Sequence, residues 1–96
     1  MLSVISEPNR QKILQIVWRE EKSAGAIASQ LDITFGAVSQ HLKILRESGA
    51  VDLRKQGRTH YYKANHEKLG PLAAYLETFW RGRLTALETL VERPRN

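Results

Sequence analysis

Cysteine is absent from this 96-residue chain, and its absence removes several kinds of chemistry at once. Disulfide bonds, thiolate metal sites and cysteine nucleophiles are all excluded. No apolar run approaches the roughly 20 residues that a membrane-spanning helix needs. Residues 1–8 also lack the charged start and the apolar stretch of a signal peptide. We therefore expect a cytoplasmic protein without a membrane partner.

Catalytic signatures are missing as well. No glycine-rich phosphate loop follows a predicted strand, and no pair of carboxylates has the spacing of a general acid and base. Ser39 and His41 lie two residues apart on a predicted helix, so their side chains point to different faces. The three histidines are isolated, and none has the i, i+4 spacing of helical metal ligands. We expect neither an enzyme nor a bound metal or other cofactor.

Positive charge is present in moderate excess, but it is concentrated in one part of the chain. The net charge is +5 overall, and residues 34–63 hold six basic and two acidic side chains, a net charge of +4. A localised basic stripe is typical of a nucleic-acid binder. The alternative is an ordinary solvated surface.

The length predicts a single domain, residues 1–96, with a small core. The first half of this domain has the sequence pattern of three helices. Pro8 suits the first turn of a helix that extends to about Arg19. Residues 20–22 read as a polar connection. Ser23 is the expected N-cap of a second helix with apolar positions up to Leu31, and Thr34 opens a third after a very short turn.

The third helix is the most informative segment. Thr34 is its expected N-cap, and Gly49 suits the left-handed residue that ends a helix. An apolar face is formed by Val38, His41, Leu42 and Leu45. The other face is small, hydrogen-bonding and basic, and consists of Gly36, Ser39, Gln40, Lys43 and Arg46. Such a helix suits the DNA major groove.

A change of period after Gly49 predicts a hairpin. Val51 and Leu53 alternate with polar residues, as in a half-buried strand. Residues 56–58 supply a turn, and Thr59 to Ala64 form a second strand. A basic hairpin directly after a helix-turn-helix is a wing. The expected fold is mainly α with a small β-hairpin: a winged helix-turn-helix with about five helices and a two-stranded wing.

The expected DNA contacts follow from this arrangement. Four residues enter the major groove, namely Gly36, Ser39, Gln40 and Lys43. Five mainly contact the backbone or the minor groove, namely Thr34, Arg46, Arg54, Lys55 and Arg58. Phe35 either touches a thymine methyl group or packs inward. His41 is expected to be a partly buried, hydrogen-bonded packing residue.

The longest predicted helix extends from Pro71 to about Glu92, after a short turn that Asn65 caps. Its apolar stripe is too wide to be buried by one small body, which suggests packing between two chains. The expected dimer contacts are Leu72, Leu76, Phe79, Trp80, Leu84, Leu87 and Val91. A small ligand cavity near Trp80 is the alternative.

Several of these segments together resemble the ArsR-type winged-helix repressors. Residues 38–46 are similar to the recognition helix of that family, residues 5–14 to its first helix and residues 57–62 to its wing. The Phe79-Trp80 pair, followed by Leu84, Leu87 and Leu90, resembles the terminal helix of its metal-independent branch. The resemblance covers residues 5 to about 92.

This resemblance implies a homodimeric prokaryotic repressor that binds a palindromic double-stranded operator, and so lies on the nucleoid. Its first and last helices would form the dimer. Family members that sense metals use cysteines before the recognition helix, or aspartate and histidine on the terminal helix. Residues 23–28 hold no thiol, and residues 71–92 hold neither aspartate nor histidine. Two alternatives stay open: a repressor that responds to a metal or to an unidentified small ligand, and a winged-helix protein-interaction module.

Overall fold

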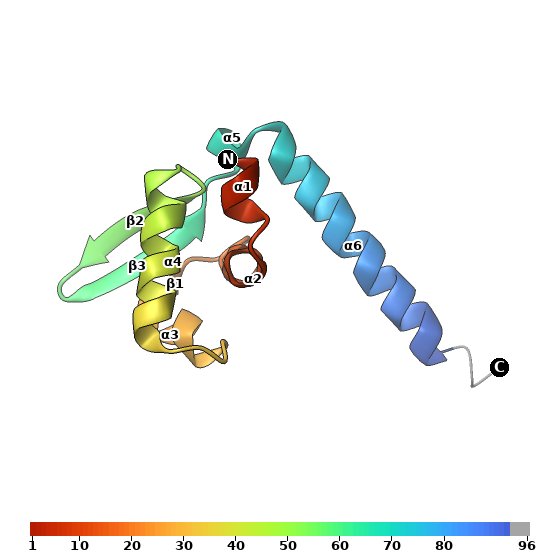
Figure 1. Ribbon diagram of the computed structural model, residues 1–96, viewed down its shortest axis with the longest axis horizontal. Helices are drawn as coiled ribbons and strands as arrows, with labels where there is room; N and C mark the ends of the chain where they lie inside the picture. The colour runs from red at the N-terminus through yellow and green to blue at the C-terminus, as the bar shows by residue number, and fades with distance from the viewer. Residues whose placement is uncertain (93–96) are drawn as a thin grey trace.

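The computed structural model describes the backbone of residues 1–92 and the side chains of residues 1–82 (Figure 1). Its elements are α1 (Leu2–Ile5), α2 (Pro8–Ile16), β1 (Lys22–Ser23), α3 (Ala24–Ser29), α4 (Phe35–Glu47), β2 (Val51–Gln56), β3 (Thr59–Ala64), α5 (His66–Leu69) and α6 (Pro71–Glu92). The expected winged helix-turn-helix is confirmed, with α3 and α4 as the helix-turn-helix pair and β2–β3 as the wing.

Side-chain caps set where the helices begin. The Ser23 hydroxyl accepts a hydrogen bond from the Ala26 backbone N–H, and the Thr34 hydroxyl accepts one from Ala37. Asn65 caps α5 in the same way. These caps satisfy backbone donors that have no partner inside a helix. Gly49 has a φ of +89° after the end of α4, the left-handed conformation that glycine adopts without strain.

The core lies where α2, α3 and α4 meet, and it is built from the periodic apolar faces of these helices. Its largest fully buried side chains include Ile13 and Leu14 of α2, Ile27 of α3, and Leu42 and Leu45 of α4. Figure 1 shows the hairpin and α6 leaving this body in opposite directions. The core therefore holds α4 between the wing and the long helix.

The described residues form six helices instead of about five, because α1 precedes the expected first helix, and other details differ as well. Helix α2 ends at Ile16 instead of about Arg19, because the Val17 carbonyl accepts a hydrogen bond from the Ala64 backbone N–H at 3.0 Å. The segment after it does not remain a polar connection, since Lys22 and Ser23 form β1 and pair antiparallel with β3. The sheet therefore has three strands, in the order β1-β3-β2.

Candidate nucleic-acid interface

Helix α4 separates its side chains as the sequence pattern predicts. Val38, Leu42 and Leu45 are buried, whereas the side chains of Ser39, Gln40, Lys43 and Arg46 are exposed. Within the described side chains, Gln40 and Lys43 make no hydrogen bond or ion pair, so their polar groups are free to meet a ligand. The outer face of α4 therefore offers hydroxyl, amide and ammonium groups together.

The first turn of α4 is open. Phe35 points outward with 57% of its surface exposed, so it does not pack inward. A Cβ atom placed on Gly36 would meet nothing within 4 Å. The Thr34 hydroxyl oxygen accepts the cap hydrogen bond, which leaves its O–H group available to donate to a phosphate. The backbone N–H groups of this turn favour an anion such as a phosphate.

His41 lies on the inner side of α4, against the start of α2. Its Nδ1 atom is 3.2 Å from Arg10 Nη1 and 3.5 Å from Glu7 Oε2. Arg10 also donates from Nε to the Val4 carbonyl, at 2.6 Å. One guanidinium thus connects α1, α2 and α4. His41 is partly buried and hydrogen-bonded, so it has the packing role expected for it and stands away from the outer face.

The basic side chains of the wing differ in whether they are paired with other residues of the protein. Lys55 and Arg58 are exposed and have no hydrogen bond or ion pair within the described side chains. Gln56 pairs with Thr59 as the last residue of β2, so the turn consists of residues 57–58 only. Gly57 has a φ of +61°, which a two-residue hairpin turn requires. Arg58 therefore stands at the tip of the wing.

The guanidinium group of Arg54 interacts with other side chains of the protein. It forms an ion pair with Glu21 at 2.6 Å and donates to Gln56 at 2.7 Å, and its guanidinium lies 4.6 Å from the centre of the Tyr61 ring. The hydrogen bond from Arg54 holds the pKa of Glu21 below its ordinary value. Sequence reasoning did not find Glu21, because it lies 33 residues away in a segment without a motif. Arg54 braces the wing, and a DNA contact would compete with this pairing.

The apolar stripe of α6 divides into two parts. Leu76, which was expected to be a dimer contact, is 5% exposed and belongs to the core of the chain itself, with Leu72 and Trp80 packed against this core. Tyr75 and Phe79 lie on another side of the helix and are 56% and 40% exposed. Of the expected dimer contacts whose side chains are described, Phe79 is the most exposed.

The other expected dimer contacts, Leu84, Leu87 and Val91, lie outside the residues whose side chains are described. For residues 1–82, no cluster of three or more histidine, aspartate or glutamate side chains is arranged to hold a metal ion. Over the same described part of the chain, no helix is long and apolar enough to cross a membrane.

Comparisons with known proteins agree with this geometry. Residues 5–54 match the family described as "Helix-turn-helix domain". The Nodulation protein NolR of Rhizobium meliloti is 30% identical over 87 residues, which cover 91% of this chain and 71% of that protein. The Transcriptional repressor SdpR of Bacillus subtilis (strain 168) is 32% identical over 65 residues, or 68% of this chain and 72% of that protein.

A solved structure extends the likeness to the fold. The ArsR-like Transcriptional Regulator from Rhodococcus sp. RHA1 superposes with a TM-score of 0.67 at 30% identity, covering 93% of this chain and 87% of that one. The family match, the relatives and the exposed polar face of α4 lead to one conclusion. The chain belongs to the helix-turn-helix domain family and is an ArsR-like winged helix-turn-helix regulator that binds DNA.

Proposed function

We propose that this protein is a homodimeric transcriptional repressor that binds a palindromic operator. The observation that carries the proposal is the outer face of α4, where Ser39, Gln40 and Lys43 are exposed beside an open first turn. Glutamine can bond adenine through two hydrogen bonds, and lysine can reach guanine or a phosphate. SdpR, a relative at 32% identity, is itself a transcriptional repressor.

The residues around this face have secondary roles in the proposal. Phe35 would contact a thymine methyl group, and Gly36 would allow the backbone of the first turn to approach the DNA closely. Lys55, Arg58 and Arg46 would contact phosphates or the minor groove, which adds affinity without base preference. Arg54 would act mainly by keeping the wing in place through Glu21.

Two copies would join through α6 and the N-terminal helix. The exposed large apolar side chains outside α4 support this arrangement, because in the described part of the chain they occur at the start of α1 and on α6: Met1, Leu2, Tyr75 and Phe79. Exposed apolar side chains on these two helices favour association with a second copy. Symmetric pairing would separate the two α4 helices by about one turn of DNA, roughly 34 Å, and would require a palindromic site.

Selection of bound DNA from a random pool, at one stated salt concentration, tests the sequence preference. Sedimentation of the protein with and without the selected duplex tests the stoichiometry. We expect a palindrome bound by two chains. A single half-site bound by one chain would contradict the dimer, and absence of any enriched motif would contradict sequence-specific binding and favour a protein-interaction module.

A matched pair of variants tests the dimer surface. Phe79→Ser should weaken association, because it removes an exposed aromatic side chain from α6. Thr78→Ala, at an exposed neighbouring position, should leave association unchanged. Equal dimerisation of both variants would place the interface elsewhere.

A further inference from the structure

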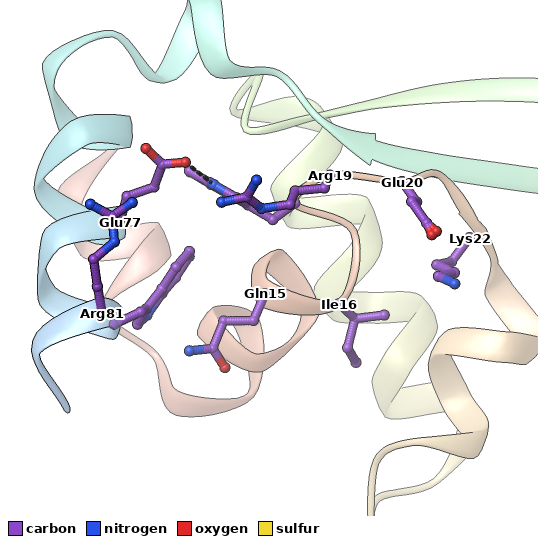
Figure 2. Close-up of a pocket in the computed structure, with 9 residues that line it drawn as sticks. Gln15, Ile16, Arg19, Glu20, Lys22, Glu77 and Arg81 are labelled. Carbon is purple, nitrogen blue, oxygen red and sulfur yellow. Dashed lines mark hydrogen bonds between the residues drawn. The ribbon is translucent and has the colours of Figure 1, made fainter. Parts of the chain in front are cut away.

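An open groove of about 690 Å³ lies between the end of α2 and α6, away from the outer face of α4 (Figure 2). Its aromatic walls come from Trp18 and Trp80, whose ring centres are 4.9 Å apart in an edge-to-face arrangement. Ile16 adds an aliphatic side chain. Trp18 is buried, whereas Trp80 and Ile16 are partly exposed, so a small planar apolar group can pack against these two side chains.

The charged side chains of the groove leave cationic groups unpaired. Figure 2 shows Arg19 reaching from the loop after α2 towards Glu77, while Arg81 approaches it along α6. Within the described residues, neither arginine forms a hydrogen bond or an ion pair. Glu77 instead accepts a hydrogen bond from Trp18 Nε1 at 2.8 Å. This bond, with the charges of Arg19, His66 and Arg81, holds the pKa of Glu77 below its ordinary value.

A buried donor in the same groove also lacks an acceptor. The Nε1 atom of Trp80 is buried and has no hydrogen-bond partner among the described residues. Buried polar groups in native proteins normally have a partner, so an unpaired indole N–H is unusual. Because this atom is buried, a ligand in the groove would meet only the guanidinium groups of Arg19 and Arg81, which are exposed and can each donate to a carboxylate.

The wall of this groove is continuous with the parts that read DNA. Trp18 and Arg19 face the groove, and Glu21, only two residues later, holds Arg54 of the wing. Ser23, at the end of the same segment, caps α3 of the helix-turn-helix pair. On its other side, the Val17 carbonyl holds the end of β3. A ligand that moves residues 17–23 would therefore disturb the wing and the helix-turn-helix together.

We infer that this groove binds a small aromatic carboxylate, and that its binding weakens the attachment of the protein to DNA. The ring packs against the exposed parts of Trp80 and Ile16, and the carboxylate accepts hydrogen bonds from Arg19 and Arg81. The ligand should weaken DNA binding and not strengthen it, because a bound anion lowers the positive charge that attracts DNA. Linkage requires DNA to weaken anion binding by the same factor. The regulatory part rests on the proposed DNA-binding function, whereas the binding site does not.

The two tryptophans make the binding site measurable without DNA. They are the only tryptophans in the chain, and both line the groove, so intrinsic fluorescence reports on it directly. Titration with benzoate should give a saturable change in emission. Arg19→Gln and Arg81→Gln should each weaken benzoate binding roughly tenfold, the loss expected for one charge-assisted hydrogen bond. Lys12→Gln removes the same charge from an exposed position of α2 outside this groove, and should bind benzoate normally.

Three outcomes of the titration would overturn the site. The first is no response to benzoate, and the second is an equal response to benzyl alcohol, which has the ring but not the charge. The third is an emission that changes with protein concentration but not with benzoate, which would identify a second copy of the chain as the occupant of the groove.

The regulatory part is tested by measuring DNA affinity with and without saturating benzoate at constant ionic strength. The regulatory proposal is supported if benzoate weakens DNA binding by the wild type but not by Arg81→Gln at the same benzoate concentration. Unchanged DNA affinity at saturation would overturn it. A ligand-free protein that binds no DNA would refute the proposed function, and the fluorescence titration would still decide the site.

Discussion

Two substitutions on α4, only two residues apart, should have opposite consequences. Leu42 is 1% exposed and belongs to the core, whereas Gln40 is exposed and makes no hydrogen bond within the described side chains. Leu42→Ala removes buried apolar groups and leaves a cavity, at a typical cost of 2–5 kcal/mol, here about 3 kcal/mol. A chain of this size has a total stability of roughly 5–14 kcal/mol.

The expected shift is large enough to measure without ambiguity. For a domain of this size, 1 kcal/mol corresponds to about 4–8 °C, so a loss of about 3 kcal/mol in Leu42→Ala should lower Tm by roughly 12–24 °C. Gln40→Ala should change the free energy of unfolding by no more than about 0.5 kcal/mol. Thermal unfolding followed by circular dichroism separates the two variants.

DNA binding should show the reverse order. At a temperature where both variants are folded, Leu42→Ala should retain the base preference of the wild type. Gln40→Ala should lose about 1–3 kcal/mol of discrimination at one base pair, which is roughly 5- to 150-fold in relative affinity. A destabilised Gln40→Ala with intact base preference, together with an unaffected Leu42→Ala, would show that the two faces of α4 are assigned the wrong way round.

Three further predictions concern the wing and the end of α4. Gly49→Ala should lower stability by about 1–2 kcal/mol in urea unfolding, because its φ is +89° and the new Cβ would stand 3.2 Å from Lys68 Cδ. Arg58→Ala should weaken binding to all DNA sequences alike and flatten the salt dependence by about one unit of slope. The pKa of Glu21 lies below its ordinary 4.5 because of the hydrogen bond from Arg54, so its contribution to stability is present above pH 4.5 and is lost as the pH falls through the lower folded value. Glu21→Gln should therefore show a flatter decline in stability below pH 4.5 than the wild type, and equal slopes would contradict the pairing.

Local signals in the sequence predicted most of the fold. Ser23, Thr34 and Asn65 are caps whose side chains act within three residues, and Gly49 ends α4 as expected. The period of two after Gly49 predicted both strands of the wing. Such features need only neighbouring residues, so a single sequence contains them.

Features that depend on distant partners were missed. β1 has only two residues and forms because β3 lies beside it. α1 has no side-chain cap, so no N-cap signal in the sequence predicts it. The pairing of Arg54 with Glu21 spans 33 residues. Leu76 was expected to be a dimer contact and is instead buried in the core of the chain, because helical periodicity cannot tell which neighbour covers an apolar side chain. The prediction of the outer face of α4 needed only the period of one helix, which is why that part of the candidate site could be placed from the sequence.

The short connection from Val17 to Ser23 also limits how the chain can change in length. Its two ends are fixed by backbone bonding to Ala64 and by the cap of α3, and Glu21 must reach Arg54 between them. An inserted or deleted residue there would misplace at least two of these anchors. The turn at Gly57 and Arg58 has no comparable restraint, because its neighbours are exposed on both strands. Homologous chains should therefore differ in length at the tip of the wing and keep a constant number of residues between α2 and α3.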